Sequence, residues 1–151
     1  MGFTKTLRIS ASALTAERLR KDVIANNIAN AHTTGPKGPY HRQRVVFRAI
    51  QQNPSFSTAF KRQLHASAKS QADIGTGVKV VRIAEDNAPG QRVYEPGHPD
   101  ADEDGYVTYP NVNVVTEMVD LLSATKAYQA NVTVINTAKT MALKALSIGN
   151  R

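Results

Sequence analysis

The sequence predicts an α+β protein in which long N- and C-terminal helices pair as an antiparallel coiled coil, with a small β-rich region between them. Apolar residues recur at three- and four-residue spacing over Thr4–Ala31 and again over Val112–Ile148. The residues between carry β-branched and aromatic runs separated by glycine and proline turns. We therefore expect an N-terminal helical part over 1–34, a β-rich middle over 35–110 and a C-terminal helical part over 111–151.

The N-terminal helix has no glycine or proline after Gly2 and should stop before Gly35 and the prolines that follow it. Leu19 and Val23 lie on its apolar stripe. Three asparagines are unusual near its end, because each costs roughly half a kcal/mol of helix propensity against alanine. They are Asn26 and Asn30 on the stripe, with Asn27 beside it.

Two interpretations of these amides remain open. An amide at a helix seam can fix register and partner at some cost in stability. Alternatively, Asn30 caps the helix end and the other two face solvent. The C-terminal helix also carries amides, including Asn131.

The C-terminal helix has no glycine or proline until Gly149 and should be about 55 Å long at ~1.5 Å per residue. Its stripe is read as Met118, Leu121, Thr125, Tyr128, Val132, Ile135, Lys139, Ala142 and Leu146. The candidate packing residues of this helix are Met118, Leu121, Leu122, Tyr128, Asn131, Val132, Ile135, Met141 and Leu146. A row of small residues, Ala124, Ala138 and Ala145, would allow close helix approach. We expect no third layer to cover the paired helices, which leaves apolar surface for other molecules.

The middle region is expected to hold four strands and a polar loop. The strand candidates are Tyr40–Ile50, Val78–Ile83, Arg92–Tyr94 and Gly105–Tyr109. The loop covers about 51–72, where no apolar pattern is present.

Charge is polarised in this middle region. The chain has net charge +7, and between His32 and Ala72 there are seven lysines and arginines and no acid. Arg42, Arg44 and Arg48 are expected to give the first strand a basic face. A basic block is either a solvated face or a surface for nucleic acid or another anion. No recognised nucleic-acid motif accompanies it, so a small basic nucleic-acid-binding protein is kept as the alternative from a different class.

No catalytic, metal or cofactor site is predicted. Asp100, Asp102, Asp104 and Gly105 match the opening of an EF-hand loop, but its twelfth position is Asn111 instead of glutamate, and no helices flank it. An acidic turn feeding a strand is therefore favoured. The histidines lack zinc-site spacing, and cysteine is absent. Neither a bilayer-spanning run nor a secretory signal is recognisable.

Both ends of the chain resemble a known family. SALTAERLRKDVIANNIANAHT, from Ser12, resembles the N-terminal signature of flagellar rod and hook proteins. GYVTYPNVNVVTEMVDLLSATKAYQANVTVINTAKTMALKALSIG resembles their C-terminal signature, and GTGVKVVRIAEDNAPGQRVYEPGHPDADEDGYV points to the proximal rod type. The likeness covers most of the chain except Gln51 to Gln71.

The resemblance implies a non-enzymatic structural subunit of the flagellar basal body. Such a subunit polymerises helically with other rod proteins into the proximal rod, which crosses the periplasm and transmits motor torque. Another axial rod or hook component is the nearest alternative. In the family the terminal helices pair and then pack against neighbouring subunits, and the asparagines would specify that packing.

The same resemblance implies the partners. These are the chain itself, other rod proteins, the rod–MS-ring junction subunit and the flagellar type III export apparatus, with no nucleic acid, no membrane span and no cofactor. Export would proceed without a cleaved signal peptide. Phe3 and Leu7 fit a family export motif of phenylalanine, three residues and then a hydrophobic residue.

Overall fold

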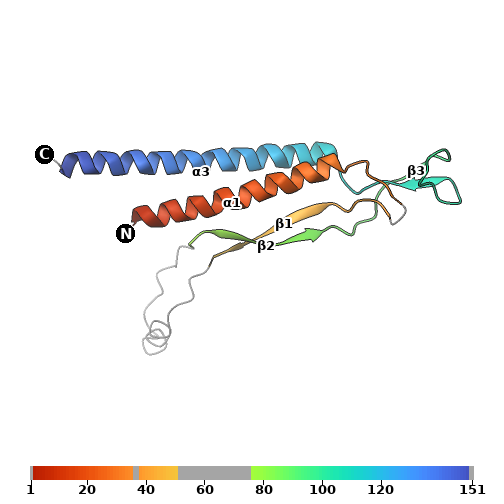
Figure 1. Ribbon diagram of the computed structural model, residues 1–151, viewed down its shortest axis with the longest axis horizontal. Coiled ribbons are helices and arrows are strands. Elements are labelled where there is room, and N and C mark those ends of the chain that lie inside the picture. Colours follow the sequence, from red (N-terminus) through yellow and green to blue (C-terminus); the bar gives the residue numbers. More distant parts are fainter. Residues whose placement is uncertain (1, 36–37, 51–75, 150–151) are drawn as a thin grey trace, which may run out of the picture.

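The computed structural model describes residues 2–35, 38–50 and 76–149. The elements are α1 (Gly2–Ala29), β1 (Gln43–Ala49), β2 (Val78–Glu85), β3 (Arg92–Tyr94), β4 (Tyr106–Thr108) and α3 (Val114–Gly149). The molecule is elongated, with the two helices side by side and the β3–β4 ribbon at the end opposite the chain termini (Figure 1). The predicted α+β class is confirmed, and the predicted loop over 51–72 lies outside the described residues.

The two helices run antiparallel, since the N- and C-termini lie at the same end of the molecule (Figure 1). Ala16 of α1 and Ala124 and Ala138 of α3 are buried, so the predicted small residues do lie where the helices approach closely, except Ala145, which is exposed. At ~1.5 Å per residue the 36 residues of α3 span about 54 Å and the 28 of α1 about 42 Å. The C-terminal turns of α3 therefore extend past the start of α1.

Six of the nine residues of the predicted α3 stripe are half-buried, but the three fully buried residues, Glu117, Ala124 and Ala138, each lie one position before a predicted one. The resulting seam has the four- and three-residue spacing of a coiled coil and runs through Glu117, Leu121, Ala124, Tyr128, Asn131, Ile135, Ala138 and Ala142. Met118 and Leu146, which the sequence placed on the stripe, are 52% and 69% exposed. The prediction was displaced because an apolar pattern cannot select a glutamate as the first buried position.

A third layer does cover α1, contrary to expectation. β1 and β2 pair antiparallel, with a bulge between Val46 and Phe47, and this β1–β2 ribbon runs along the side of α1 remote from α3 (Figure 1). Ser12 joins the layers, because its hydroxyl donates to the Ile9 carbonyl over 2.7 Å and accepts from the Val78 amide over 3.1 Å. Helix α1 is thus the middle layer of three.

The β3–β4 ribbon forms a separate small unit at the far end. Val107 is its buried centre, and the rings of Tyr94 and Tyr106 meet edge to face with centroids 5.3 Å apart. The acidic turn feeds β4, as the sequence favoured, and Gly105 closes it with a positive φ of 78°. Asp100 accepts a 2.7 Å hydrogen bond from the Thr34 hydroxyl, which fastens this turn to the end of α1.

The part of the chain that the structure describes holds neither a membrane-spanning helix nor a cluster of metal ligands. None of the helices within 2–35, 38–50 and 76–149 is long and apolar enough to cross a membrane. Across the same residues, no three His, Cys, Asp or Glu side chains are grouped closely enough to hold a metal ion.

Replacing Gly77 by alanine should loosen the β1–β2 ribbon from α1. Gly77 has φ +131° at the start of β2, and a methyl group there would overlap the Ser12 hydroxyl. Strain of this kind costs ~1–3 kcal/mol. We expect urea unfolding followed by circular dichroism to show a loss in that range. Gly97→Ala is the matched control, because no atom lies within 4 Å of its added carbon; equal losses in both variants would contradict the close approach.

Candidate assembly site

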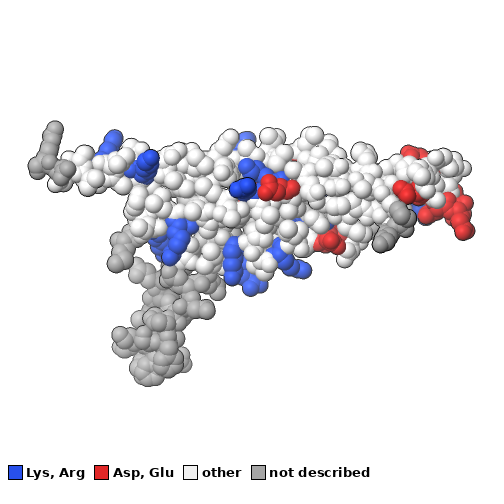
Figure 2. All heavy atoms as spheres, in the orientation of Figure 1, with Lys and Arg blue, Asp and Glu red and all other residues white. Residues whose placement is uncertain are grey.

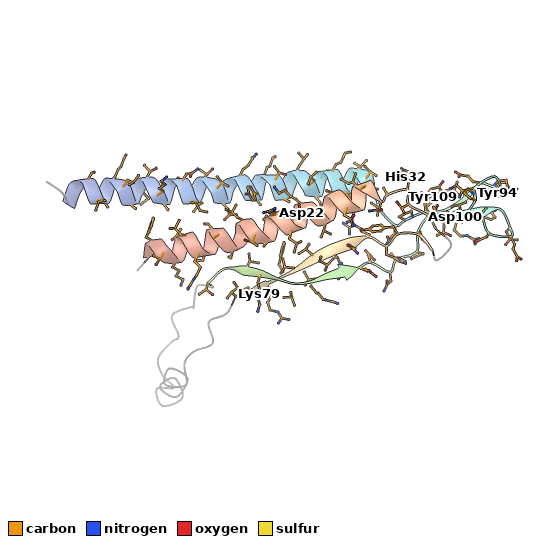
Figure 3. All side chains as sticks on the ribbon, in the orientation of Figure 1. Asp22, His32, Lys79, Tyr94, Asp100 and Tyr109 are labelled. Atoms are coloured by element: carbon orange, nitrogen blue, oxygen red, sulfur yellow. The ribbon has the colours of Figure 1, made fainter. Side chains whose placement is uncertain are left out.

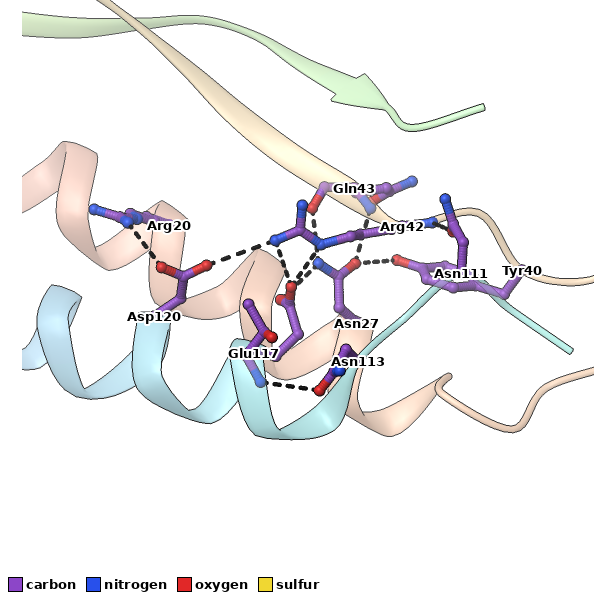
Figure 4. Close-up of polar contacts among 10 residues, drawn as sticks. Arg20, Asn27, Tyr40, Arg42, Gln43, Asn111, Asn113, Glu117 and Asp120 are labelled. Atoms are coloured by element: carbon purple, nitrogen blue, oxygen red, sulfur yellow. Dashed lines mark hydrogen bonds and ion pairs between the residues drawn. The ribbon is translucent and has the colours of Figure 1, made fainter. Parts of the chain in front are cut away.

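The side chain of Asn27 lies at the centre of a buried polar cluster that joins α1, β1 and α3 (Figure 4). It is 1% exposed. Its Nδ2 donates to the Gln43 carbonyl over 2.7 Å and to the Glu117 carboxylate over 3.0 Å. Its Oδ1 accepts from the Gln43 amide over 2.9 Å and from the Tyr40 hydroxyl over 2.8 Å. An amide suits this position because both its donors and both its acceptor positions are used.

The Glu117 carboxylate is the buried charge of this cluster. Glu117 is 1% exposed, and Arg42 neutralises it through Nε and Nη2, each 2.6 Å from Oε1. A buried carboxylate is tolerated only when it is paired and hydrogen-bonded, and here Arg42 and Asn27 together supply those contacts. Asp120 extends the pairing, since it lies 3.6 Å from Arg42 and 3.6 Å from Arg20.

Flanking side chains fix the segments that carry the cluster. Asn111 accepts from the Arg42 amide over 2.9 Å and donates to the Asp86 carbonyl over 2.9 Å. Asn113 caps α3, because its side chain accepts from the Thr116 amide over 3.1 Å. Burial raises the pKa of the Tyr40 phenol above its ordinary value, so it stays protonated and donates to Asn27.

The three predicted asparagines separate into two roles, and their predicted placement was wrong. Asn27 is the buried one, whereas Asn26 is exposed and Asn30 half-buried. The Asn30 side chain donates to the Asn26 carbonyl over 2.9 Å, a carbonyl that also accepts from the Asn30 backbone amide over 3.0 Å. Its contacts are therefore local to the last turn of α1, whereas Asn27 joins three segments of the chain.

The other predicted packing residues divide between the seam and the surface. Val23 is buried, and the half-buried ones are Leu19, Leu121, Tyr128, Asn131, Val132 and Ile135. Tyr128 receives the Lys21 ammonium 4.2 Å from its ring centroid, a cation–π contact between α1 and α3. The exposed ones are Met118, Leu122, Met141 and Leu146, at 52%, 62%, 66% and 69%.

Eight of the nine exposed large apolar residues of α3 fall into two groups, and the ninth, Val134, lies between them. One occupies its first turns and consists of Val115, Met118, Val119 and Leu122. The other occupies its last turns and consists of Met141, Leu143, Leu146 and Ile148. Large contiguous apolar patches on a surface are typical of interaction sites.

The candidate export residues lie at the start of α1. Phe3 is 42% exposed and Leu7 is half-buried. Phe3 lines an apolar groove of about 460 Å³ against α3, together with Val134 and Met141.

Sequence reasoning missed Glu117 and the internal role of Arg42. Glu117 was not singled out at all, and Arg42 was interpreted as part of a basic strand face. The available signal was the polar residue at a heptad position: Glu117 is four residues before Leu121 and seven before Ala124. No rule of spacing links it to Arg42 or Asn27, which are far away in the chain.

Comparisons with known proteins agree with this architecture. The family model described as flagella basal body rod protein matches residues 7–37, which hold α1 and the turn after it. The model described as flagellar basal body rod FlgEFG protein C-terminal matches residues 103–148, which hold β4 and α3. The paired terminal helices are thus those of a flagellar basal-body rod protein.

Full-length relatives give the particular family. The flagellar basal-body rod protein FlgC of Borreliella burgdorferi is 45% identical over 98% of this chain and 98% of its own length. The FlgC proteins of Bacillus subtilis and Escherichia coli are 45% and 44% identical, over 95% and 99% of this chain and 96% and 99% of their own. The chain belongs to the FlgC family, and the resemblance inferred from the signatures is confirmed.

Replacing Asn27 by aspartate should destabilise the protein strongly. The new carboxylate would lose the donor to the Gln43 carbonyl and lie beside the Glu117 carboxylate, where the present separation is 3.0 Å. Such a change costs ~3–5 kcal/mol in free energy of unfolding. Asn136→Asp, at an exposed position of α3 away from the cluster, should change it by less than ~0.5 kcal/mol. Urea unfolding at neutral pH measures both.

Acidification provides a second readout of the same variant. Protonating the introduced carboxyl removes its charge and restores a donor, so the deficit of Asn27→Asp against the natural chain should shrink as the pH falls toward 4, near its ordinary pKa of about 3.9. A deficit that is unchanged by pH would contradict the proximity of the two carboxylates.

Proposed function

We propose that this chain is a non-enzymatic structural subunit of the flagellar basal-body rod, assembling with copies of itself and with other rod proteins. The observation that carries the proposal is the full-length likeness to FlgC proteins, at 42–45% identity in the three relatives above and in the one from Yersinia enterocolitica. Those proteins are named for the rod. The geometry adds an elongated shape and apolar helix surface that the single chain leaves exposed.

Different parts of the subunit are proposed to have different roles in assembly. The helical parts 1–34 and 111–151 form the core of the subunit; within the middle region, 35–110, the β1–β2 ribbon lies along α1 and the β3–β4 ribbon lies at one end (Figure 1). The exposed apolar turns at both ends of α3 contact neighbouring subunits. Asn27 contributes to these contacts indirectly, because it fixes the angle at which α1, the β1–β2 ribbon and α3 meet.

The position of the subunit in the rod and its route of export are also part of the proposal. The subunit forms the proximal part of a rod that crosses the periplasm and transmits motor torque, and it contacts the rod–MS-ring junction subunit. It travels through the flagellar type III export apparatus without a cleaved signal peptide, with Phe3 and Leu7 as the export motif. The support for this motif is its place at the start of α1, with Phe3 partly exposed.

Deleting the gene in its flagellated host and restoring it on a plasmid tests the proposal directly. Basal bodies isolated from the deletion strain should lack an assembled rod, and the plasmid should restore both rods and swimming. Rods of normal length without this chain would overturn the proposal.

Removing the apolar character of the last turns of α3 should block assembly after export. The variant is Leu143→Ser, Leu146→Ser, Ile148→Ser, and the three side chains that it removes are 58%, 69% and 76% exposed in the single chain. Burying each of them against a neighbouring subunit would contribute ~1.5–3 kcal/mol to assembly. We expect the variant to be secreted at normal amounts and to be missing from isolated basal bodies, measured by immunoblot of both fractions.

The matched control is Lys144→Ala, Ser147→Ala, which changes exposed polar residues on the same turns. It should assemble and support swimming. Normal motility of the apolar variant would show that these turns make no subunit contact.

A further inference from the structure

Charges of opposite sign collect on two separate parts of the molecule (Figure 2). The acidic tip, residues 92–108 with β3 and β4, holds Glu95, Asp100, Asp102, Glu103 and Asp104 against one arginine, Arg92. The β1–β2 ribbon holds Arg44, Arg48, Lys79 and Arg82 against one acid, Glu85. Lys79 lies on this ribbon, whereas Tyr94 and Asp100 lie at the opposite end of the molecule (Figure 3).

The basic residues of the ribbon lack acidic partners within the part of the chain that is described. Arg44, Arg48, Lys79 and Arg82 are all exposed, and none forms an ion pair with another described residue. Arg48 and Lys79 are directly opposite each other in the β1–β2 register. Like charges placed opposite each other across a ribbon are destabilising because they repel each other. An anionic partner bound beside Arg48 and Lys79 would offset this repulsion.

Arg42 does not belong to this surface. The sequence grouped it with Arg44 and Arg48 on one basic face, but the structure turns it inward to Glu117, so the predicted grouping was wrong. The exposed basic surface of the β1–β2 ribbon is therefore smaller than the sequence predicted. Its residues can be replaced without disturbing the buried cluster around Asn27.

The acidic tip complements the β1–β2 ribbon both in charge and in apolar surface. Glu103 and Asp104 are exposed and form no ion pair with a described residue, whereas Asp102 is paired with Arg92 at 3.2 Å. Tyr94 on the same tip is 63% exposed, and tyrosine is favoured in the centre of interfaces. The ribbon offers aliphatic surface beside its charges, since Val81 and Ile83 are each 44% exposed.

We propose that the acidic tip of one copy of this chain docks onto the basic β1–β2 ribbon of the next copy. The two surfaces lie on different parts of one elongated molecule, so the contact joins different patches of successive copies. A contact of this heterologous kind produces an open helical assembly unless the rotation closes a ring. The inference rests on the proposed function and adds to it which surfaces set the register between copies.

Cysteine cross-linking in the assembled rod tests the contact, and the chain has no natural cysteine to interfere. Two tagged versions of different size, one Lys79→Cys and one Glu103→Cys, are produced together in a host that lacks its own gene. Isolated basal bodies are then treated with a short bifunctional thiol reagent. A mixed dimer of the two sizes is expected, and chains that carry only one of the cysteines should give none.

Charge exchange provides the second arm. Arg48→Glu, Lys79→Glu should lower incorporation into basal bodies about tenfold, the equivalent of ~1.4 kcal/mol. Adding Glu103→Lys, Asp104→Lys to the same chain should restore most of it. Adding Asp22→Lys, Gln129→Lys, Asn136→Lys, at exposed positions of α1 and α3, restores the same net charge away from the acidic tip; it is the matched control and should restore none of the incorporation.

Three results would overturn the inference. Incorporation of the tagged chains without a mixed dimer would show that the contact is absent while the proposed function stands. A defect that the exchanged charges do not repair would assign the ribbon to a different anionic partner, such as another rod protein or a wall polymer. Failure of the natural chain to enter basal bodies would overturn the proposed function together with the inference.

Discussion

The buried carboxylate of Glu117 is the constraint on which the rest of the structure depends. It lies at the first buried position of α3 and can remain there only with a cation and a donor beside it. Arg42 directly precedes β1, the strand that follows α1, and Asn27 comes from α1 itself. Three segments that are far apart in the chain must therefore come together at one point before any of them is satisfied.

This requirement explains why α1 is the middle layer. Asn27 holds the first residue of β1 through both backbone groups of Gln43, and Ser12 holds the first residue of β2. The β1–β2 ribbon is thus fastened to α1 at both ends, while the small residues Ala16, Ala124 and Ala138 let α3 approach on the other side. The result is a subunit whose layers keep a fixed geometry, as repeated contacts in an assembly require.

The surfaces proposed to contact neighbouring subunits are of two kinds. The ends of α3 present aliphatic side chains. Burying them lowers the free energy of binding to any apolar partner, so these surfaces supply affinity. The ribbon and the acidic tip present opposite charges, whose exposed pairs are weak singly but discriminate between wrong and right register. A protein that must assemble in one order needs both kinds of surface.

The sequence by itself determined the α+β class, the six elements found in the described residues, the antiparallel pairing and the family, because helical periodicity, turn residues and terminal signatures are local properties. It placed β3 at Arg92–Tyr94 as observed and put the ends of the longer elements within a few residues. Only the tertiary structure decided that Asn27 is buried and Asn26 exposed, that the seam begins at Glu117 and excludes Met118, and that Arg42 points inward. The reason is physical: whether a polar side chain is buried depends on partners that lie up to 90 residues away in the chain, as Glu117 does from Asn27, and no periodicity records them.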